Sequence, residues 1–273
     1  MPELPEAETI ASDLRRRVEG ARVRGAVVPR PDILSGIAPG ALDRRLRGRR
    51  IERVGRRGKN VLLELDDGAR VCVNLGMTGR LLTSDAPNAD EMGHVAARFA
   101  LDDGRELLFD DTRRFGRIEL LEPRAWAERD AALGLEPLSD AFTPAALRAL
   151  TRRSRSPIRN WLLDQRFVAG VGNIYANEAL HLAAVRPRRG ARTLRRRETD
   201  ALHRALRDVL RRAVRARGTT LRDFLGGGGE VGSFRPRLRV YGRAGEPCLA
   251  CGTPVKRVVF ANRSAFYCPT CQR

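Results

Sequence analysis

Four of the five cysteines fall in the last 26 residues, in two pairs with the same internal spacing. Cys248 and Cys251 form one C-x-x-C, Cys268 and Cys271 form another, and 16 residues separate the two. Each C-x-x-C turn can aim two thiolates at one ion, and two such turns close a tetrahedral site. Four protein ligands leave no open position, so we expect one structural Zn²⁺. Cys72 alternates with apolar neighbours in a strand pattern and is predicted to be a small core residue.

The chain is strongly basic. It has 52 Lys plus Arg against 33 Asp plus Glu, a net charge of +19, and residues 186–222 alone contain 14 Arg. This excess predicts attraction to a polyanion, nucleic acid first, and is too one-sided for paired salt bridges along a helix. Only Lys59 and Lys256 are lysines, so each is a candidate for chemistry that needs an ammonium group.

Length and composition limit the class of protein. With 273 residues, of which 42% are hydrophobic, the chain is long enough for two domains and a smaller piece. No apolar run approaches the roughly 20 residues of a membrane helix, and the N-terminus lacks a signal-peptide pattern. We therefore expect a cytoplasmic monomer, in the bacterial cytosol or nucleoid, with reduced thiols and no membrane association.

The hydrophobic period changes along the chain. Apolar residues from Ala7 to Val18 predict a first helix, with Pro5 at its first position. Asp-Gly turns at residues 66–68 and 102–104 predict hairpins of 61–65 with 70–75 and of 95–101 with 106–109. Helical periods follow, with starts at Thr143–Pro144 and Ser156–Pro157 and a long helix over 199–217. A glycine-rich link at 226–229 precedes the cysteine-bearing end, so the fold class is α+β with several domains.

Several motifs together resemble the formamidopyrimidine-DNA glycosylases. In chain order these are MPELPE at 1–6, Gly58-Lys59, NLGMTG at 74–79, RRFG at 113–116, GVGNIYANE at 170–178, VYGR at 240–243 and the four-cysteine finger. They follow the family's order and span nearly the whole chain. The resemblance implies a catalytic β-sandwich with an N-terminal helix at 1–122 and a helix–two-turn–helix DNA-binding domain at 123–225. A lid or linker at 226–240 and a zinc-finger hairpin at 241–273 complete it.

The resemblance also implies an activity. The family excises oxidised purines, formamidopyrimidines and 8-oxoguanine, from damaged double-stranded DNA and then cuts the abasic strand by β,δ-elimination. Removal of Met1 would expose Pro2 as a secondary amine with a pKa near 8, a nucleophile for C1′ of the damaged nucleotide. By resemblance, Glu3 protonates the sugar or base, Glu6 supports that site and Lys59 serves β-elimination. Arg263 grips the flanking phosphates and assists the second elimination. Acids at residues 3 and 6 also suit helix capping.

Other motif residues are expected to bind DNA. Extruding a base leaves a gap in the duplex, and Met77, Arg113 and Phe115 match the family's three gap-filling residues. By composition alone, the methionine and phenylalanine would be assigned to the core. Arg113 is expected to read the opposite base, cytosine, and Asn173 begins a helix suited to clamping a phosphate. Residues 218–221 and the glycine loop up to Phe234 resemble the lid over the flipped base.

The sequence departs from the family pattern at several positions, some of which contact DNA in the family. The differences are Asn74 for His, Glu91–Met92 for Lys-His, Thr112 for Pro, Ser154 for a basic residue and Arg159 for Lys. His94 remains from a two-histidine phosphate-contacting segment, and Arg155, next to Ser154, is a candidate replacement contact. Because the catalytic residues are intact, these departures concern affinity and lesion preference.

Three alternatives stay open on sequence alone. The sister class that removes oxidised pyrimidines shares Pro2, Glu3 and the finger, but usually begins Pro-Glu-Gly-Pro and lacks the gap-filling trio. A catalytically silent DNA-binding paralogue would keep the fold without forming a borohydride-trapped adduct. A ribosome-type structural protein would account for the charge and the zinc ribbon only.

Overall fold

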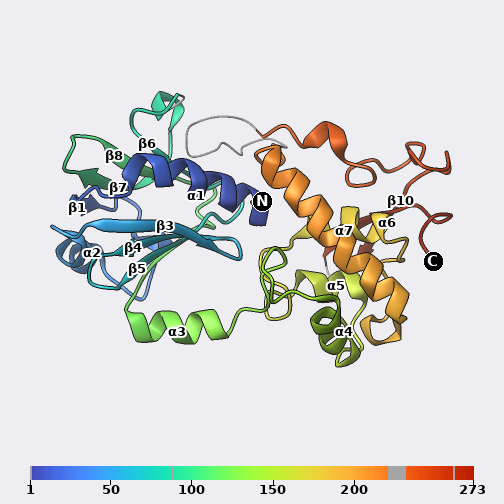
Figure 1. Cartoon of the computed structure of the whole chain (residues 1–273). Helices are drawn as coiled ribbons and strands as arrows, with labels where there is room; N and C mark the ends of the chain where they lie inside the picture. Colours follow the sequence, from blue (N-terminus) through green and yellow to red (C-terminus); the bar gives the residue numbers. More distant parts are fainter. Residues whose placement is uncertain (1, 88, 221–231, 261) are drawn as a thin grey trace. The chain divides into compact units, whose positions relative to one another are not determined.

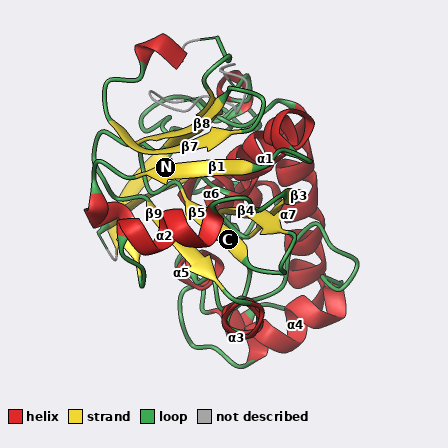
Figure 2. Ribbon diagram, turned by 90° about the vertical axis from the view of Figure 1, so that its left-hand side faces the viewer, coloured by secondary structure: helices red, strands yellow, loops and turns green. Residues whose placement is uncertain are grey.

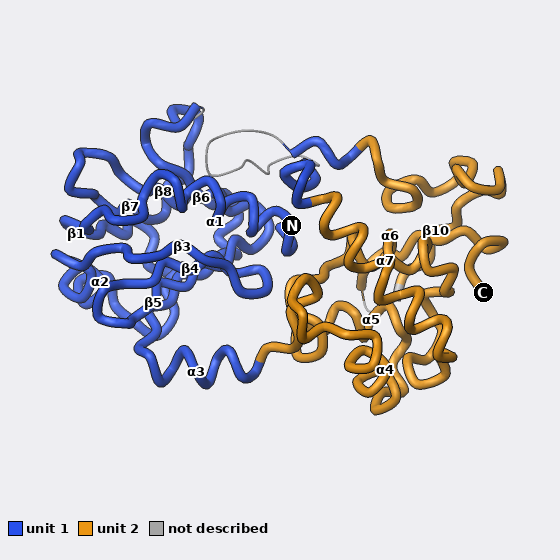
Figure 3. Tube along the Cα trace, viewed as in Figure 1, with its two compact units in different colours: residues 1–132, 214–235 blue, residues 133–213, 236–273 orange. Residues whose placement is uncertain are grey.

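The computed structural model describes residues 2–87, 89–220, 232–260 and 262–273. Met1 and residues 221–231, which carry most of the glycine loop expected to form a lid, lie outside the described residues. The chain divides into two units (Figure 3), Met1–Ala132 with Val214–Arg235 and Leu133–Ala213 with Pro236–Arg273. Among the described residues, no helix has the length and apolar character needed to cross a bilayer.

The first unit is a β-sandwich (Figures 1 and 2). One sheet has the order β1 (Val23–Val27), β7 (Val95–Leu101), β8 (Glu106–Asp110), β6 (Arg80–Thr83). The other has the order β2 (Leu34–Ser35), β9 (Arg117–Leu121), β5 (Arg70–Asn74), β4 (Asn60–Leu65), β3 (Ile51–Arg57). The β4–β5 and β7–β8 pairs are antiparallel, which confirms both hairpins predicted from Asp-Gly turns.

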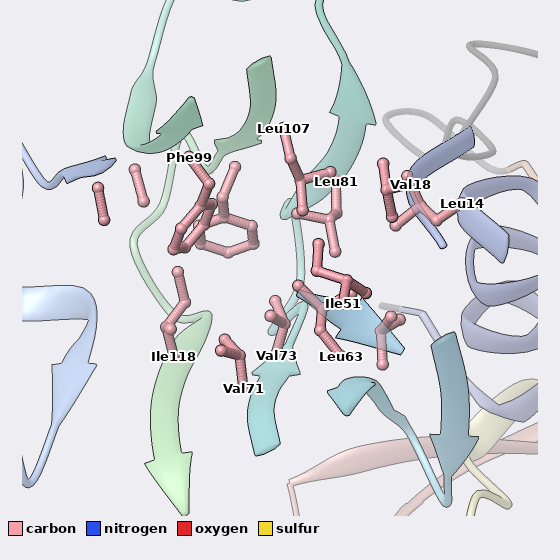
Figure 4. Close-up of a cluster of buried hydrophobic side chains, with 14 of the residues drawn as sticks. Leu14, Val18, Ile51, Leu63, Val71, Val73, Leu81, Phe99, Leu107 and Ile118 are labelled. Atoms are coloured by element: carbon pink, nitrogen blue, oxygen red, sulfur yellow. The ribbon is translucent and has the colours of Figure 1, made fainter. Parts of the chain in front are cut away.

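The core of this unit lies between the two sheets (Figure 4). Phe99, Leu81 and Leu107 of one sheet face Val71 and Val73 of the other, and all five are buried. Leu14 and Val18 of helix α1 close one side of this core. Cys72 is buried as predicted, and burial raises the pKa of its thiol to about 12.

Helix α1 (Leu4–Val18) begins one residue earlier than predicted, since Leu4 is its first residue and Pro5 its second. Its apolar stripe is fully buried, as the periodicity required. Helices α2 (Pro39–Leu46) and α3 (Pro123–Ala131) complete the regular α-helices described in this unit. Single 3₁₀ turns occur at Pro31–Ile33 and Ala89–Glu91.

The second unit is helical and ends in a β-hairpin. It contains α4 (Pro144–Arg152), α5 (Ile158–Leu163), α6 (Asn173–Leu182), most of α7 (Arg196–Arg215), the strands β10 (Lys256–Phe260) and β11 (Arg263–Tyr267), and 3₁₀ turns at Ala191–Thr193 and Arg235–Arg237. Strands β10 and β11 pair in antiparallel register. This arrangement confirms the predicted α+β fold with a helical domain and a terminal finger.

The structure confirms one predicted helix start and corrects two others. Thr143 caps α4 as predicted, because its Oγ1 accepts the Ala146 N–H at 3.1 Å. Helix α5 starts at Ile158, with Pro157 rather than Ser156 as its N-cap. Helix α7 starts at Arg196 instead of residue 199, because its first turn is solvated and carries no apolar periodicity. It ends at Arg215, before Arg217 takes a left-handed φ of +60°.

Candidate active site and metal centre

The N-terminal segment of the first unit is fixed by the carboxylate of Glu6. Its Oε2 accepts the backbone N–H of Glu3 at 2.8 Å, and its Oε1 accepts the backbone N–H of Thr219 at 2.7 Å. Pro2, Glu3 and Glu6 are all buried. Gly218 has a φ of +85°, and a Cβ there would lie 2.8 Å from Glu6 Oε1, so this close approach requires glycine. Glu6 therefore ties the start of α1 to the segment after α7.

A second carboxylate of α1 strengthens that tie. Asp13 is 2% exposed, and its Oδ2 accepts from an Arg217 Nη at 2.6 Å while its Oδ1 accepts from Arg16 at 2.8 Å. A buried carboxylate needs such partners, because an unpaired buried charge is strongly destabilising. Two acids, about two helical turns apart, thus hold the segment after α7 against α1.

Lys59 lies in the two-residue turn between β3 and β4. Arg56 of β3 supports this turn through two hydrogen bonds, donating from Nε to Glu8 Oε2 of α1 and from an Nη to the Gly58 carbonyl, both at 2.8 Å. The bridge links the lysine turn to the helix that carries the N-terminal acids. The structure thus brings Lys59 and the Pro2–Glu6 segment into one region of the first unit.

The two loops that carry the gap-filling candidates pack backbone to backbone. Met77 follows β5 and Phe115 precedes β9, and their exposed fractions are 39% and 51%. A Cβ on Gly76, whose φ is +58°, would lie 2.5 Å from the Phe115 carbonyl carbon. The guanidinium of Arg113 lies over the Phe115 ring, 4.7 Å from its centroid. The core position that composition alone would give Met77 and Phe115 is therefore wrong, and all three side chains are presented to solvent.

Asp111 organises these loops. It is fully buried, and its Oδ2 accepts the Gly116 N–H at 2.7 Å, while Oδ1 accepts from the Arg113 N–H at 3.3 Å. The Thr78 hydroxyl donates to the same Oδ1, which connects the Met77 loop to the Arg113 loop. The backbone carbonyl of His94 accepts the Asp111 N–H at 3.2 Å, so the exposed His94 lies beside the loop that carries Arg113.

Asn74, where histidine is common in the family, has a structural role here. Its Nδ2 donates to Asn60 Oδ1 at 2.8 Å, and its Oδ1 accepts the Gly76 N–H at 3.0 Å. The amide therefore bridges β4 to the loop that carries Met77. A neutral imidazole also has one donor and one acceptor, but its two ring nitrogens are placed differently from Nδ2 and Oδ1 of the amide, so histidine would not reproduce both contacts.

In the second unit, Asn173 is the first residue of α6 and sits in a polar network. Its Oδ1 accepts from an Arg159 Nη at 2.6 Å, and its Nδ2 donates to the Ser264 carbonyl at 3.1 Å. Arg159 is fully buried, and burial lowers the pKa of its guanidinium. The amide of Asn173 thus connects α6 to strand β11 of the finger. Because the N-terminus of a helix favours an anion, this end of α6 suits a phosphate.

Arg263, at the start of β11, is exposed. Together with Arg159, Asn160, Leu163 and Asp164 it lines a cavity of about 320 Å³. Arg155 is exposed in the loop between α4 and α5. Arg155 and Arg263, both exposed, and the two arginines of this cavity suit contact with a phosphate backbone.

The four finger cysteines converge. Their Sγ atoms all lie within 4.8 Å of one another, and those of Cys251 and Cys268 are 3.4 Å apart. A tetrahedral zinc with Zn–S bonds of about 2.3 Å places its sulfurs about 3.8 Å from one another. The four-sulfur set therefore fits one zinc ion, and it leaves no ligand position for a substrate.

The protonation of these thiols also favours a cation. Burial raises the pKa of Cys268, and a hydrogen bond with Cys251 raises the pKa of Cys271 to about 12. Hydrogen bonds, of which the one with Thr253 has the largest effect, lower the pKa of Cys251 to about 6. Crowding thus opposes several thiolates at once, whereas a divalent cation bound by all four would offset two of their four negative charges and favour the deprotonated form of each ligand.

Comparison with known proteins covers the whole chain. The family models for the formamidopyrimidine-DNA glycosylase N-terminal domain, its H2TH domain and the zinc finger found in FPG and IleRS match residues 1–118, 133–224 and 245–273. The chain is 46% identical to the formamidopyrimidine-DNA glycosylase of Chloroflexus aggregans, covering 100% of this chain and 98% of that relative. The chain belongs to the formamidopyrimidine-DNA glycosylase family. It is a DNA glycosylase of base-excision repair that acts on oxidised purines, and abasic-site lyase activity is the family's second activity.

Solved structures agree with this assignment. The MutM (Fpg) protein of Thermus thermophilus is 42% identical, with a TM-score of 0.89 and coverage of 99% of this chain and 98% of that one. The Lactococcus lactis Fpg, described in complex with DNA containing an abasic site, is 31% identical, with a TM-score of 0.89 and 99% coverage of both chains. A ribosome-type structural protein is therefore not the correct interpretation of the charge and the finger.

Two buried acids of this glycosylase were missed by the sequence analysis as organising residues. Asp111 was overlooked beside the RRFG motif, although an acid just before a loop of motif residues can indicate a side chain that holds the loop backbone. Glu178 was quoted within GVGNIYANE without a role. It is 2% exposed and accepts three backbone N–H groups, from Arg239 and Tyr241 at 2.8 Å and from Val240 at 2.9 Å.

Proposed function

We propose that the mature glycosylase begins at Pro2 and that the Pro2 amine is its nucleophile. The amine attacks C1′ of the damaged nucleotide, so the N–C1′ bond forms and the glycosidic bond breaks as the base leaves with a proton. The nitrogen then loses its own proton, and the C1′–O4′ bond breaks as O4′ takes up a proton, which opens the sugar ring. The resulting cationic imine acidifies C2′, so loss of a C2′ proton expels the 3′ phosphate. A second elimination then releases the 5′ phosphate. An α-amino pKa near 8 leaves a useful neutral fraction at neutral pH.

The observation that supports this mechanism most directly is the double anchoring by Glu6. Its carboxylate holds the Glu3 N–H and the Thr219 N–H at 2.8 and 2.7 Å, which fixes the residue next to the nucleophile. We assign to Glu3 the protonation of the opening sugar or departing base, and to Glu6 the support of that site. Lys59, on the turn bridged to α1, serves β-elimination, since it is one of only two lysines in the chain.

The exposed trio fits the gap left by an extruded base. Extrusion costs a few kcal/mol of unstacking and unpairing, and side chains that fill the gap offset part of this cost. Met77 is the flexible wedge, Phe115 stacks, and Arg113 reads the opposite cytosine through its guanidinium. The Arg113–Phe115 contact at 4.7 Å pre-orients both side chains before DNA binds.

The second unit supplies phosphate contacts. We assign these to Asn173 at the N-terminus of α6, to Arg155 and to Arg263, with His94 contributing from the first unit; Arg263 also assists the second elimination. One zinc ion, held by Cys248, Cys251, Cys268 and Cys271, keeps the β10–β11 hairpin folded. We further propose that the protein acts as a monomer on damaged duplex DNA in the bacterial cytosol.

The test is to trap the covalent intermediate on a duplex containing 8-oxoguanine opposite cytosine. Borohydride reduction followed by peptide mass spectrometry should place the DNA remnant on the Pro2 nitrogen. Pro2→Gly should bind the duplex but lose most excision, and Glu3→Gln should bind yet fail to release the base. Lys59→Ala should be less impaired on a pre-formed abasic site. A remnant found on a lysine, with the Pro2 amine free, would overturn the mechanism without affecting the family assignment.

A further inference from the structure

His181 of α6 contacts the metal centre without belonging to the four-cysteine motif. Its side chain is 6% exposed, and its Nε2 lies 3.5 Å from Cys248 Sγ. The other ring nitrogen, Nδ1, is buried and has no hydrogen-bond partner among the described residues. A neutral imidazole carries a single N–H, on one of these two nitrogens.

The chemistry of the sulfur decides which ring nitrogen carries that hydrogen. A zinc-bound cysteine is a thiolate, which has no proton to donate and can only accept. The 3.5 Å contact is therefore a hydrogen bond only if Nε2 is the protonated nitrogen and Nδ1 holds the lone pair. An N–H donor withdraws charge from the sulfur and orients it, as other outer-shell partners do for metal ligands.

We propose that His181 is a positioning residue of the zinc site, donating its Nε2–H to the Cys248 thiolate and so retaining the metal. The inference rests on the proposed occupation of the four-cysteine site by zinc. Its consequence reaches beyond the finger, because His181 and Asn173 lie on the same helix. The helix that offers its N-terminus to a phosphate thus also holds a zinc ligand.

A purely structural role for His181 is the competing explanation. The finger, however, is already attached to α6 by two other buried side chains. Asn177 Oδ1 accepts the Phe266 N–H at 2.8 Å, and Glu178 accepts the three N–H groups of residues 239–241. Neither of these contacts involves a cysteine sulfur, so the His181 contact differs from them in kind. Its removal should change the metal site more than the attachment.

The test compares variants of His181 with a matched histidine. H181F keeps an aromatic ring of similar size and removes the donor, whereas H181Q places an amide N–H near the former Nε2. H203Q is the control, because His203 is another histidine of the second unit, half-buried, with its Nε2 2.6 Å from the Phe142 carbonyl and its ring stacked on Phe142. Each zinc-loaded protein is mixed with 4-(2-pyridylazo)resorcinol, and zinc release is followed by absorbance.

Zinc release from H181F should be about 10- to 100-fold faster than from the unmodified protein, the range typical of lost outer-shell contacts. Release from H181Q should stay within about threefold of the unmodified protein by the same comparison, and H203Q should not differ. In the Co²⁺-substituted proteins, the sulfur-to-metal charge-transfer band of H181F should move to lower energy, because the thiolate is more electron-rich. A purely packing role would not move this band.

The proposal is overturned if H181F retains zinc as the unmodified protein does, or if H181Q loses it as fast as H181F. Should H181F fail to fold, H181Q alone decides: retention supports the N–H donor and rapid loss contradicts it. Zinc analysis of the unmodified protein distinguishes a failure of the proposed metal site from a failure of the role proposed for His181. Absence of zinc there would refute the proposed metal site, whereas zinc with identical release from H181F would refute only the role of His181.

Discussion

Glu178→Gln tests the carboxylate of α6 that holds the segment leading into the finger. Oε1 accepts the N–H groups of Val240 and Tyr241, and Oε2 accepts that of Arg239. Glutamine retains one oxygen, which can serve the first two donors, but its NH₂ would face the Arg239 N–H, donor against donor. Two charge-assisted bonds become neutral ones, and the partly buried Arg239 N–H loses its acceptor.

The expected cost follows from these three contacts. Hydrogen bonds to charged groups contribute about 1.5–3 kcal/mol against about 0.5–1.5 for neutral ones, and a buried unsatisfied donor costs about 1–3 kcal/mol. Relief of carboxylate burial, which raises the pKa of Glu178, offsets part of the sum. We expect a local loss of about 3 kcal/mol, which corresponds to faster opening by a factor on the order of 10².

Hydrogen–deuterium exchange with peptide-level mass spectrometry measures this directly. Peptides spanning residues 236–246 of Glu178→Gln should exchange on the order of 10² times faster. Glu246→Gln is the control in the same segment, because its partner Arg243 is bound at 2.8 Å but the Glu246 side chain is 55% exposed; it should change exchange by less than about threefold. Equal exchange in the two variants would refute the reasoning that the Glu178 carboxylate secures this segment.

Three further predictions concern DNA and thiols. Arg113→Ala should reduce the preference for cytosine over adenine opposite 8-oxoguanine by about tenfold or more in kcat/KM, given about 1–3 kcal/mol for a good base contact; an unchanged ratio would remove its assigned role. R204A/R211A, which removes two exposed arginines of α7, should lower the slope of log affinity against log salt by about 1.8, at about 0.9 per phosphate, and an unchanged slope would show that this face does not meet DNA. At pH 8, Ellman's reagent should find no fast thiol among the five cysteines of the zinc-loaded protein and four after chelation. Loss of the metal should unfold the finger and so remove the hydrogen bond with Cys251 that raises the pKa of Cys271. Cys72, with its thiol pKa at about 12, stays protonated far below that value and should react only on unfolding; five fast thiols before chelation would contradict both the metal site and the burial.

Local patterns in the sequence determined much of the fold and some of the site. The hairpins were predictable because Asp-Gly turns need particular backbone angles and fix the strands on either side. The metal centre was predictable because the two turns of C-x-x-C place ligands by local geometry, and the cysteines at 248 and 268 then need only one hairpin to meet. The helix start at Thr143 was predictable for the same reason, since capping involves residues three apart. The catalytic assignment of Pro2 came from motif resemblance, not from periodicity.

The tertiary structure decided which side chains are exposed and which distant segments are joined. Met77 and Phe115 are residue types usually found in cores. Here they are exposed, because their two loops pack closely at Gly76 and are held together by the Asp111 carboxylate. The Glu6–Thr219 contact joins residues 213 positions apart, a separation over which no periodicity carries information. His181 was indistinguishable from any other helical histidine in the sequence. Its contact with Cys248 depends on how a helix and a finger, each predictable locally, pack against each other, and such packing is set by the sum of many weak long-range contacts.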